Sequence, residues 1–296
     1  MRDMGPLIVV SKLEERLNDP DLRLLDCRFD LMSPHAGREA WADGHIPGAV
    51  YADLDQDLAG AITEESGRHP LPDVGDLCET FGRLGIDSST SVVVYDSGSG
   101  GIAARAWWLL RWLGHERVAL LDGGIAAWQT QGGQIESGIT SVETREFTGN
   151  SRDQIVITTA EIVASSDAVT GRLVDARDAA RFRGESEPID AVAGHIPGTR
   201  NLPFGESLDD AGHWKAEQDL QVLWTELLGE QPPKDWAVMC GSGVTACHLA
   251  VSACLAGLPE PRLYVGSWSE WIRDPARPVA RGDSAIETVQ NAAEPA

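Results

Sequence analysis

The segment Gly44-His45-Ile46-Pro47-Gly48 decides the fold of this chain, because the same five residues recur as Gly194-His195-Ile196-Pro197-Gly198. Three further landmarks recur in the same order: Leu24 to Arg28 matches Leu173 to Arg177, Val92 to Asp96 matches Trp236 to Cys240, and Leu120 to Gly124 matches Leu263 to Ser267. Ordered self-similarity of this kind is the signature of a repeated structural unit. The chain is therefore predicted to consist of two copies of one domain, which we call copy one and copy two.

Each copy alternates short apolar runs with helical patterns. The apolar runs are RLLDC, SVVVYD and RVALLDG in copy one and RLVDA, DWAVMC and RLYVG in copy two, and helical patterns span residues 103–113 and 244–255. Such runs are typical of strands that are buried in a parallel sheet. We therefore predict an α/β fold of two tandem domains, each with a mainly parallel sheet flanked by helices on both faces.

Composition and turn residues suggest the domain boundaries. We predict copy one at residues 1–135, a linker rich in Gly, Ser, Thr and Glu at residues 136–153, copy two at residues 154–283, and a polar, flexible tail at residues 284–296. A length of 296 residues is sufficient for two ordinary domains.

The formal net charge of −22 excludes some classes of partner. An acidic chain should repel nucleic acid and anionic membrane surfaces, so we expect neither as a partner. No apolar run approaches the length of about 18 residues that a membrane-spanning helix needs. The first residues resemble a strand and a helix rather than a secretory signal, so a cytoplasmic location is expected.

The five cysteines point to one reactive thiol among buried ones. Their number is odd and their spacing irregular, which argues against a disulfide framework. They form no CxxC pair, and we expect no metal site.

Cys240 is the candidate nucleophile. It stands between the apolar run 236–239 and a helical pattern, in a tight loop that contains Gly241 and Gly243. Such loops direct several backbone N–H groups at one point, and the following helix adds the positive end of its dipole. The alternative is a buried structural cysteine at a strand end, which is common. The glycines favour the nucleophile, because a structural cysteine needs no such cradle.

Copy one carries Asp96 at the position of Cys240, followed by Ser97-Gly98-Ser99-Gly100-Gly101. Because it has no thiol at this point, copy one is predicted to be inactive and structural, with its loop framing the cleft.

Along nearly its whole length the chain resembles the tandem-domain rhodanese-type sulfurtransferases. The loop from Cys240 to Thr245 is most similar to that of the 3-mercaptopyruvate branch. The thiosulfate branch usually carries basic residues at the second and third loop positions, where this chain has Gly241 and Ser242. The two HIPG segments and the GSWSEW segment at residues 266–271 support the family but not the substrate.

The resemblance implies a substrate-carboxylate ligand in Arg181, which lies in the segment ARFRG at residues 180–184. A guanidinium group binds a planar carboxylate through two bonds. The family usually has a second Arg in a segment like EPR, but here Ile189 takes that place. Either Arg183 or another Arg compensates, or the substrate is bound more loosely, or the sulfur donor differs.

The resemblance also implies a proton-handling triad of Asp55, His69 and Ser242, in which copy one lends two groups to copy two. The cradle for the substrate sulfur would be made by Gly241, Gly243, Val244 and Thr245. His45 and His195, in the HIPG turns, are predicted to stabilise those turns. No metal or organic cofactor is implied.

The implied reaction moves sulfur from 3-mercaptopyruvate, through a persulfide on Cys240, to an acceptor thiol such as thioredoxin or to cyanide, and it releases pyruvate. The nearest alternative is a thiosulfate:cyanide sulfurtransferase, and another is a non-enzymatic persulfide relay module. A cysteine phosphatase is disfavoured, because its Cys-x5-Arg loop would need Arg where Ala246 stands. A dinucleotide enzyme is disfavoured because no GxGxxG run follows the first strand.

Overall fold

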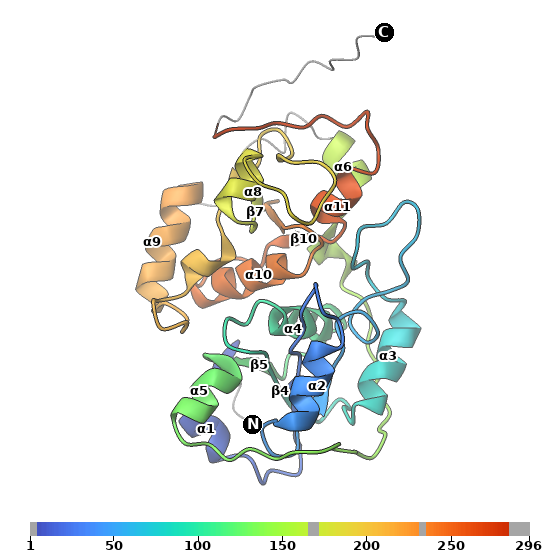
Figure 1. The fold of residues 1–296 in the computed structure, drawn as a ribbon, viewed down its shortest axis with the longest axis vertical. Coiled ribbons are helices and arrows are strands. Elements are labelled where there is room, and N and C mark those ends of the chain that lie inside the picture. Colours follow the sequence, from blue (N-terminus) through green and yellow to red (C-terminus); the bar gives the residue numbers. More distant parts are fainter. Residues whose placement is uncertain (1–4, 165–171, 231–234, 284–296) are drawn as a thin grey trace.

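The computed structural model describes residues 5–164, 172–230 and 235–283, and it confirms the predicted α/β fold of two similar units (Figure 1). Each unit contains a five-stranded sheet in which the described strand pairs are all parallel. The sheet of copy one has the order β1 (Leu7–Ile8), β5 (Val118–Leu121), β4 (Ser91–Tyr95), β2 (Leu22–Asp26), β3 (Val50–Tyr51). The sheet of copy two repeats it as β6 (Val156–Ile157), β10 (Arg262–Tyr264), β9 (Ala237–Met239), β7 (Leu173–Asp175), β8 (Arg200–Asn201).

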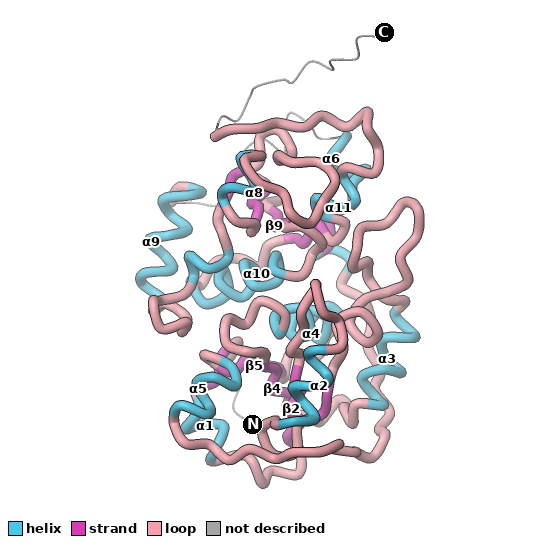
Figure 2. The backbone as a smooth tube through the Cα atoms, viewed as in Figure 1, coloured by secondary structure: helices cyan, strands magenta, loops and turns pink. Residues whose placement is uncertain are grey.

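Helices cover both faces of each sheet (Figure 2). The helices of copy one are α1 (Val10–Glu14), α2 (Ala36–Asp43), α3 (Val74–Arg83), α4 (Ala103–Trp112) and α5 (Gly124–Thr130). Those of copy two are α6 (Thr159–Ala164), α8 (Ala179–Arg183), α9 (Glu217–Leu228), α10 (Thr245–Leu255) and α11 (Ser267–Trp271), with short 3-10 helices η1 (Asp153–Ile155) and η2 (Phe204–Ser207). The strand β4 shows why the apolar runs are continuous: Val92 and Val94 pack into one core and Val93 and Tyr95 into another.

The helices α4 and α10 lie side by side between the two sheets (Figure 1). A single apolar core includes Trp108 of α4 and Leu249 of α10, together with strand residues of both copies. The loops that precede these two helices therefore meet between the copies. There the ring of His248 bonds through Nε2 to the carbonyl oxygen of Ser99, at 3.0 Å.

In each copy the HIPG turn is bonded to a second repeated landmark, an aspartate followed two residues later by an arginine. Arg28 is paired with Asp26 at 2.6 Å and donates to the carbonyl of Gly44 at 2.7 Å. Copy two repeats this arrangement, with Arg177 paired with Asp175 at 2.7 Å and bonded to the carbonyl of Gly194 at 2.8 Å. In both copies a guanidinium group thus holds the glycine that opens the HIPG turn.

The histidines of these turns are buried and bonded to the backbone. His45 Nδ1 lies 2.7 Å from the carbonyl oxygen of Trp41, and His195 Nδ1 lies 2.8 Å from that of Phe182. The ring of His195 also stacks on Phe182. These contacts fit the turn-stabilising role predicted for both residues.

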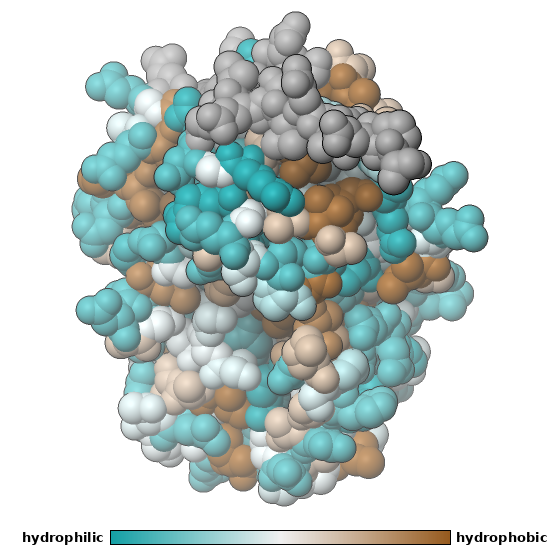
Figure 3. Space-filling model, turned by 45° about the horizontal axis from the view of Figure 1, so that its top comes forward, coloured by the Kyte–Doolittle hydropathy of each residue, from teal (hydrophilic) through white to brown (hydrophobic). Residues whose placement is uncertain are grey.

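The segment between α5 and η1 contains no helix and lies along copy one, where Gly138 bonds to Ala42 and Arg145 to Gly82 through their backbones. The predicted tail at residues 284–296 lies outside the described residues. Within the described ranges, no helix has the length and apolar character needed to cross a bilayer. Figure 3 shows a face covered mainly by polar side chains with scattered apolar ones, as the net charge of −22 would favour.

Candidate active site

Cys240 stands directly after β9, at the carboxyl edge of the sheet, where open α/β folds bind ligands. Its side chain is buried and its Sγ accepts the backbone N–H of Gly243 at 3.1 Å. Gly243 has a φ of 75°, and a Cβ there would lie 2.4 Å from the carbonyl oxygen of Val265. Only glycine can therefore shape the loop so that this N–H reaches the sulfur.

The first turn of α11 holds the Cys240 loop from the other side. Ser267 Oγ accepts the N–H of Cys240 at 3.1 Å and donates to the carbonyl of Tyr264 at 2.8 Å. Ser267 adopts a left-handed backbone with a φ of 53°, which costs a non-glycine residue about 1–2 kcal/mol. Backbone strain of this kind is typical of functional sites, and no local sequence pattern singles out Ser267.

A small pocket of about 140 Å³ opens at Cys240. It is lined by residues from both copies: Phe29, Leu31, Leu54, Arg68, His69, Ile102, Arg181, Ile189, Cys240, Gly241, Ser242, Val244 and Thr245. Drug-sized ligands need cavities of about 300–1,000 Å³, so this pocket suits a much smaller molecule.

Ser242, His69 and Asp55 are brought together as predicted from the resemblance. His69 Nδ1 lies 2.8 Å from Ser242 Oγ, and His69 Nε2 lies 3.2 Å from Asp55 Oδ1. Because a carboxylate can only accept, Nε2 carries the proton of the neutral ring and Nδ1 accepts the hydroxyl proton of Ser242.

Burial, together with the positive charges of Arg105 and Arg68, lowers the pKa of His69 from 6.5 to about 3. His69 is therefore neutral at physiological pH. A neutral imidazole flanked by a hydroxyl and a carboxylate can pass a proton on, but it is too weak a base to keep one.

Arg181 lies where the resemblance places it, in the wall of the pocket. It is paired with Glu187 at 2.8 Å and with Asp190 at 3.1 Å. Arg183 is paired instead with the exposed Glu185 and does not line the pocket. Ile189, at the position of the family's second Arg, lines the pocket but offers no donor beyond its backbone.

Two arginines of copy one also belong to the site, although the sequence analysis did not identify them. Arg68 lines the pocket beside His69. Arg105, in α4, is fully buried and donates to the carbonyls of Gly243, at 3.1 Å, and His69, also at 3.1 Å. Its charge interacts favourably with Cys247 and Cys240. The available signal for a buried cation was the presence of Arg105 and Arg111 within the apolar pattern 103–113.

The predicted cradle residues divide into two groups. Gly241, Val244 and Thr245 line the pocket, whereas Gly243 supplies the N–H that reaches Sγ. Across the residues that the structure describes, no group of three His, Cys, Asp or Glu side chains has the arrangement of metal ligands.

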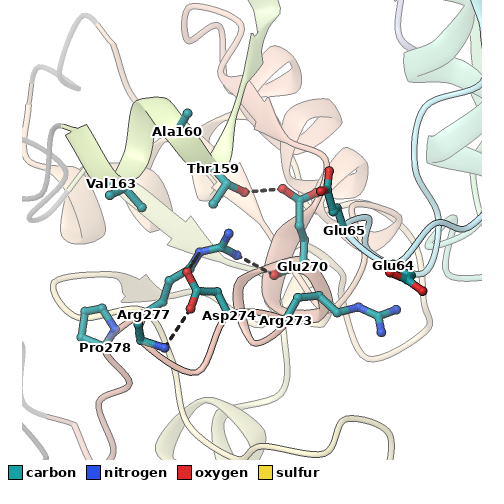
Figure 4. A pocket seen from close by; sticks show the side chains of 11 residues that line it. Glu64, Glu65, Thr159, Ala160, Val163, Glu270, Arg273, Asp274, Arg277 and Pro278 are labelled. Carbon is teal, nitrogen blue, oxygen red and sulfur yellow. Dashed lines mark hydrogen bonds and ion pairs between the residues drawn. The ribbon is translucent and has the colours of Figure 1, made fainter.

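A larger hollow of about 760 Å³ lies beside α11, and Figure 4 shows its lining. Its side chains are mainly carboxylates and guanidinium groups, and the hydroxyl of Thr159 is already bonded to Glu270 and Tyr264. The lining contains no thiol, so the smaller pocket at Cys240 is the better candidate for a covalent reaction.

Comparison with known proteins identifies the family of the chain. The model of the rhodanese-like domain matches residues 9–131 and again residues 158–274. A protein of Pseudomonas aeruginosa named probable 3-mercaptopyruvate sulfurtransferase is 46% identical over 279 residues, which cover 94% of this chain and 98% of that protein.

Two further comparisons bear on the substrate and the fold. The putative thiosulfate sulfurtransferase SseB of Mycobacterium tuberculosis is 39% identical over 93% of this chain and 97% of its own. The crystal structure of the 3-mercaptopyruvate sulfotransferase SseA from Escherichia coli superposes with a TM-score of 0.75 at 30% identity, over 90% of this chain and 99% of that one.

Proposed function

Because this chain belongs to the rhodanese family, as a sulfurtransferase with two rhodanese-like domains, we propose that it transfers sulfur from 3-mercaptopyruvate through a persulfide on Cys240. The observation that carries the proposal is the shared pocket. It places a thiol in a backbone N–H cradle, a guanidinium group and a Ser–His pair around a volume of about 140 Å³. A small keto acid with a sulfur atom needs these three features together.

The first half-reaction begins with the thiolate of Cys240, which attacks the sulfur of the donor. The new S–S bond forms as the C–S bond breaks, and the electron pair of that bond passes to the carbon of the departing pyruvate enolate. The proton of the donor thiol ends on that carbon, so the products are pyruvate and the Cys240 persulfide anion. Arg181 orients the carboxylate of the donor.

Ser242 and His69 support the proton transfer. The Ser242 oxygen accepts the donor proton while its own proton moves to His69 Nδ1, and Asp55 stabilises the transient imidazolium. Because the pKa of His69 is only about 3, the ring returns the proton at once to the enolate carbon.

In the second half-reaction a nucleophile attacks the outer sulfur, and Cys240 leaves as a thiolate. The acceptor is a thiol, such as that of a reduced thioredoxin, or cyanide. A covalent intermediate shared by two half-reactions gives ping-pong kinetics. The two substrates and the side chains of this protein supply every atom and electron pair of the two half-reactions. We propose that the reaction takes place in the cytoplasm.

Thiosulfate is the second candidate donor, because a relative with 39% identity is named a putative thiosulfate sulfurtransferase. Gly241 and Ser242 make thiosulfate the less favoured donor, because neither side chain supplies a positive charge for the thiosulfate dianion. A persulfide relay that forms the intermediate without rapid turnover is the remaining alternative.

Mass spectrometry after incubation with each donor tests the proposal. We expect 3-mercaptopyruvate to add one sulfur atom to the peptide that contains Cys240, and its kcat/KM to exceed that of thiosulfate by at least about tenfold. Cys240→Ser should lose the added sulfur, whereas the control Cys254→Ser, half-buried on α10, should keep it.

Three other results would each replace the proposal. A higher kcat/KM with thiosulfate would favour the thiosulfate enzyme, and a persulfide without turnover would favour the relay. Sulfur that remains on Cys240→Ser would mean that another residue carries it.

A further inference from the structure

The guanidinium group of Arg105, in α4, joins three separate segments of the chain. Its Nη1 donates to the carbonyl oxygen of Gly243 at 3.1 Å, in the loop that follows β9 in copy two. Its Nη2 donates to the carbonyl oxygens of His69, at 3.1 Å, and Pro70, at 3.2 Å, and its Nε donates to that of Leu58 at 3.3 Å. One planar group thus ties the nucleophile loop of copy two to two loop segments of copy one.

Arg105 is a costly residue to bury at this place. Its side chain is fully buried, and it forms no ion pair with a carboxylate in the described part of the chain. A buried charge without an opposite charge is unfavourable, so packing alone would favour an apolar residue. The matching residue of α10, at the offset that relates Asp96 to Cys240, is the buried Leu249. The cation therefore occurs in copy one alone, from where it reaches the loop of copy two.

The bond from Arg105 acts on the residue whose N–H contacts the nucleophile. Gly243 donates its N–H to Cys240 Sγ at 3.1 Å, while its carbonyl oxygen accepts from Arg105 and also from Cys247 Sγ, at 3.3 Å. Ser242 directly precedes Gly243. The guanidinium group thus helps to fix the loop that carries both the thiol and the hydroxyl of the site.

His69 is held from both sides along the chain. Before it, the backbone N–H of Arg68 donates to Ser269 Oγ at 3.1 Å, in the first turn of α11. After it, Arg105 binds the carbonyl oxygens of His69 itself and of Pro70. Among the contacts of the described residues, the guanidinium group is therefore the link that holds the His69 segment and the Gly243 segment at once.

We propose that Arg105 is a positioning residue of the sulfur-transfer reaction, which sets the distance between His69 Nδ1 and Ser242 Oγ by holding the loops that carry them. The inference rests on the proposed function, because that reaction moves the donor proton through this contact. Proton transfer needs a heavy-atom separation of about 2.6–3.2 Å, and the two atoms lie 2.8 Å apart. A displacement of about 1 Å between the loops would interrupt the transfer. Arg105 itself does not line the pocket.

The two half-reactions, measured separately in Arg105→Lys, test this role. Lysine keeps the positive charge but replaces the planar fork by one nitrogen, which cannot hold both loops in the same way. We expect the rate of pyruvate release in a single turnover with 3-mercaptopyruvate to fall about tenfold. The rate of thiocyanate formation from the preformed persulfide and cyanide should stay within about threefold of wild type, because that step does not use the proton transfer.

A double-mutant cycle shows whether Arg105 acts through His69. In the His69→Gln background, Arg105→Lys should lower pyruvate release by less than about twofold, since the transfer that it positions is already lost. Arg111→Lys is the matched control, because Arg111 lies on the same helix but is paired with Glu260 instead of the two loops. It should match wild type in both half-reactions.

Circular dichroism melting establishes that each variant is folded. If Arg105→Lys does not fold, Arg105→Met replaces it in the same cycle, because a long apolar side chain avoids burial of a charge. For Arg105→Met we expect pyruvate release to fall about 10- to 100-fold in the wild-type background and less than about twofold in the His69→Gln background.

Three results would overturn the role of Arg105. They are a rate of pyruvate release within about twofold of wild type, an equal slowing of both half-reactions, and a loss of the same size with and without His69. An equal slowing would mean that Arg105 only maintains the loop structure. Failure of the proposed function looks different, since wild-type protein would then release no pyruvate from 3-mercaptopyruvate and accumulate no persulfide.

Discussion

The two loops that follow β4 and β9 are built alike but are occupied differently. In copy one the carboxylate of Asp96 accepts the backbone N–H groups of Gly98, Gly100, Ile102 and Ala103 at 2.9–3.2 Å. In copy two Cys240 Sγ accepts the N–H of Gly243 alone among the described residues. Copy one thus fills its loop with a carboxylate that accepts four N–H groups, whereas the thiol of copy two accepts one among the described residues.

This difference explains how one architecture yields a structural domain and a candidate catalytic one. We expect the cradle to favour an anion in both copies, because a loop and a helix N-terminus follow the strand in each. A carboxylate satisfies the site without a ligand and adds stability. A thiol leaves it available for a persulfide.

Each loop is also contacted by a histidine of the other copy. His69 of copy one bonds to Ser242 at 2.8 Å, and His248 of copy two bonds to the carbonyl of Ser99 at 3.0 Å. The first contact reaches a side chain in the pocket, whereas the second reaches only the backbone. The two histidine contacts therefore occupy equivalent positions, but only that of His69 involves a side chain of the pocket.

The largest expected effect comes from giving copy two the residue of copy one. Cys240→Asp should lower sulfur transfer by about 10⁴-fold or more, because it removes the nucleophile. The new carboxylate should accept loop N–H groups as Asp96 does, so urea unfolding should show a stability at least equal to that of Cys240→Ser. A Cys240→Asp protein clearly less stable than Cys240→Ser would mean that the two cradles are not equivalent.

The reverse change removes the built-in anion of copy one. Asp96→Ala leaves four loop N–H groups without their acceptor, two of them buried and two half-buried, and should cost about 3 kcal/mol of unfolding free energy. Asp96→Asn, which keeps one acceptor oxygen, should cost less. Activity per folded molecule should stay within about threefold of wild type, and a stability change under about 0.5 kcal/mol for Asp96→Ala would contradict the comparison.

A third test exchanges the residues at the equivalent left-handed positions, Gly124 and Ser267, whose φ values are 56° and 53°. A Cβ on Gly124 would lie 2.5 Å from the carbonyl oxygen of Asp96, so Gly124→Ser should destabilise by about 2 kcal/mol. Ser267→Gly relieves strain but loses the bond from Cys240, so stability should change by less than about 1 kcal/mol. The kcat of Ser267→Gly should nevertheless fall about tenfold, and an unchanged kcat would remove Ser267 from the site.

The smallest expected effect is on the pH dependence of stability. Burial lowers the pKa of both His69 and His248 from 6.5 to about 3. Below pH 6.5 each histidine binds a proton in the unfolded chain but not in the folded one. Each therefore removes about 1.4 kcal/mol of stability per pH unit as the pH falls from 6.5 toward 3.

Urea unfolding between about pH 6 and pH 5 measures this slope. His69→Gln and His248→Gln should each reduce it by about 1.4 kcal/mol per pH unit. Only His69→Gln should also lower sulfur transfer, because only His69 reaches a side chain of the pocket. Equal losses of activity in both variants would show that the contacts are alike in function.

The sequence predicted those parts of the site that depend on local pattern. Cys240 could be identified because a thiol stood between an apolar run and a helical pattern, among glycines that bend the chain. The inert copy could be identified because Asp96 occupied the matching position. The grouping of Asp55, His69 and Ser242 came only from the resemblance, since no local pattern joins residues so far apart.

The parts that were missed depend on contacts between the copies. Arg68 gave no signal apart from its place beside His69, because its position in the pocket wall depends on the contact of its loop with Ser269 of α11. Ser267 could have been suspected from its alignment with Gly124, but a φ of 53° cannot be read from a serine. The resemblance left the substitute for the second Arg open; Arg183 is paired with Glu185 outside the pocket, whereas Arg68 lines it.

The sequence by itself determined the duplication, the α/β class and the thiol of Cys240, because hydrophobic periodicity, turn glycines and ordered repeats are local properties of the chain. Only the tertiary structure decided that the loop of His69 and Arg68 lies against Cys240. That contact exists because α4 and α10 pack in one core and bring the carboxyl edges of the two sheets together. Packing over such distances depends on the shapes of whole surfaces, which no short stretch of sequence encodes.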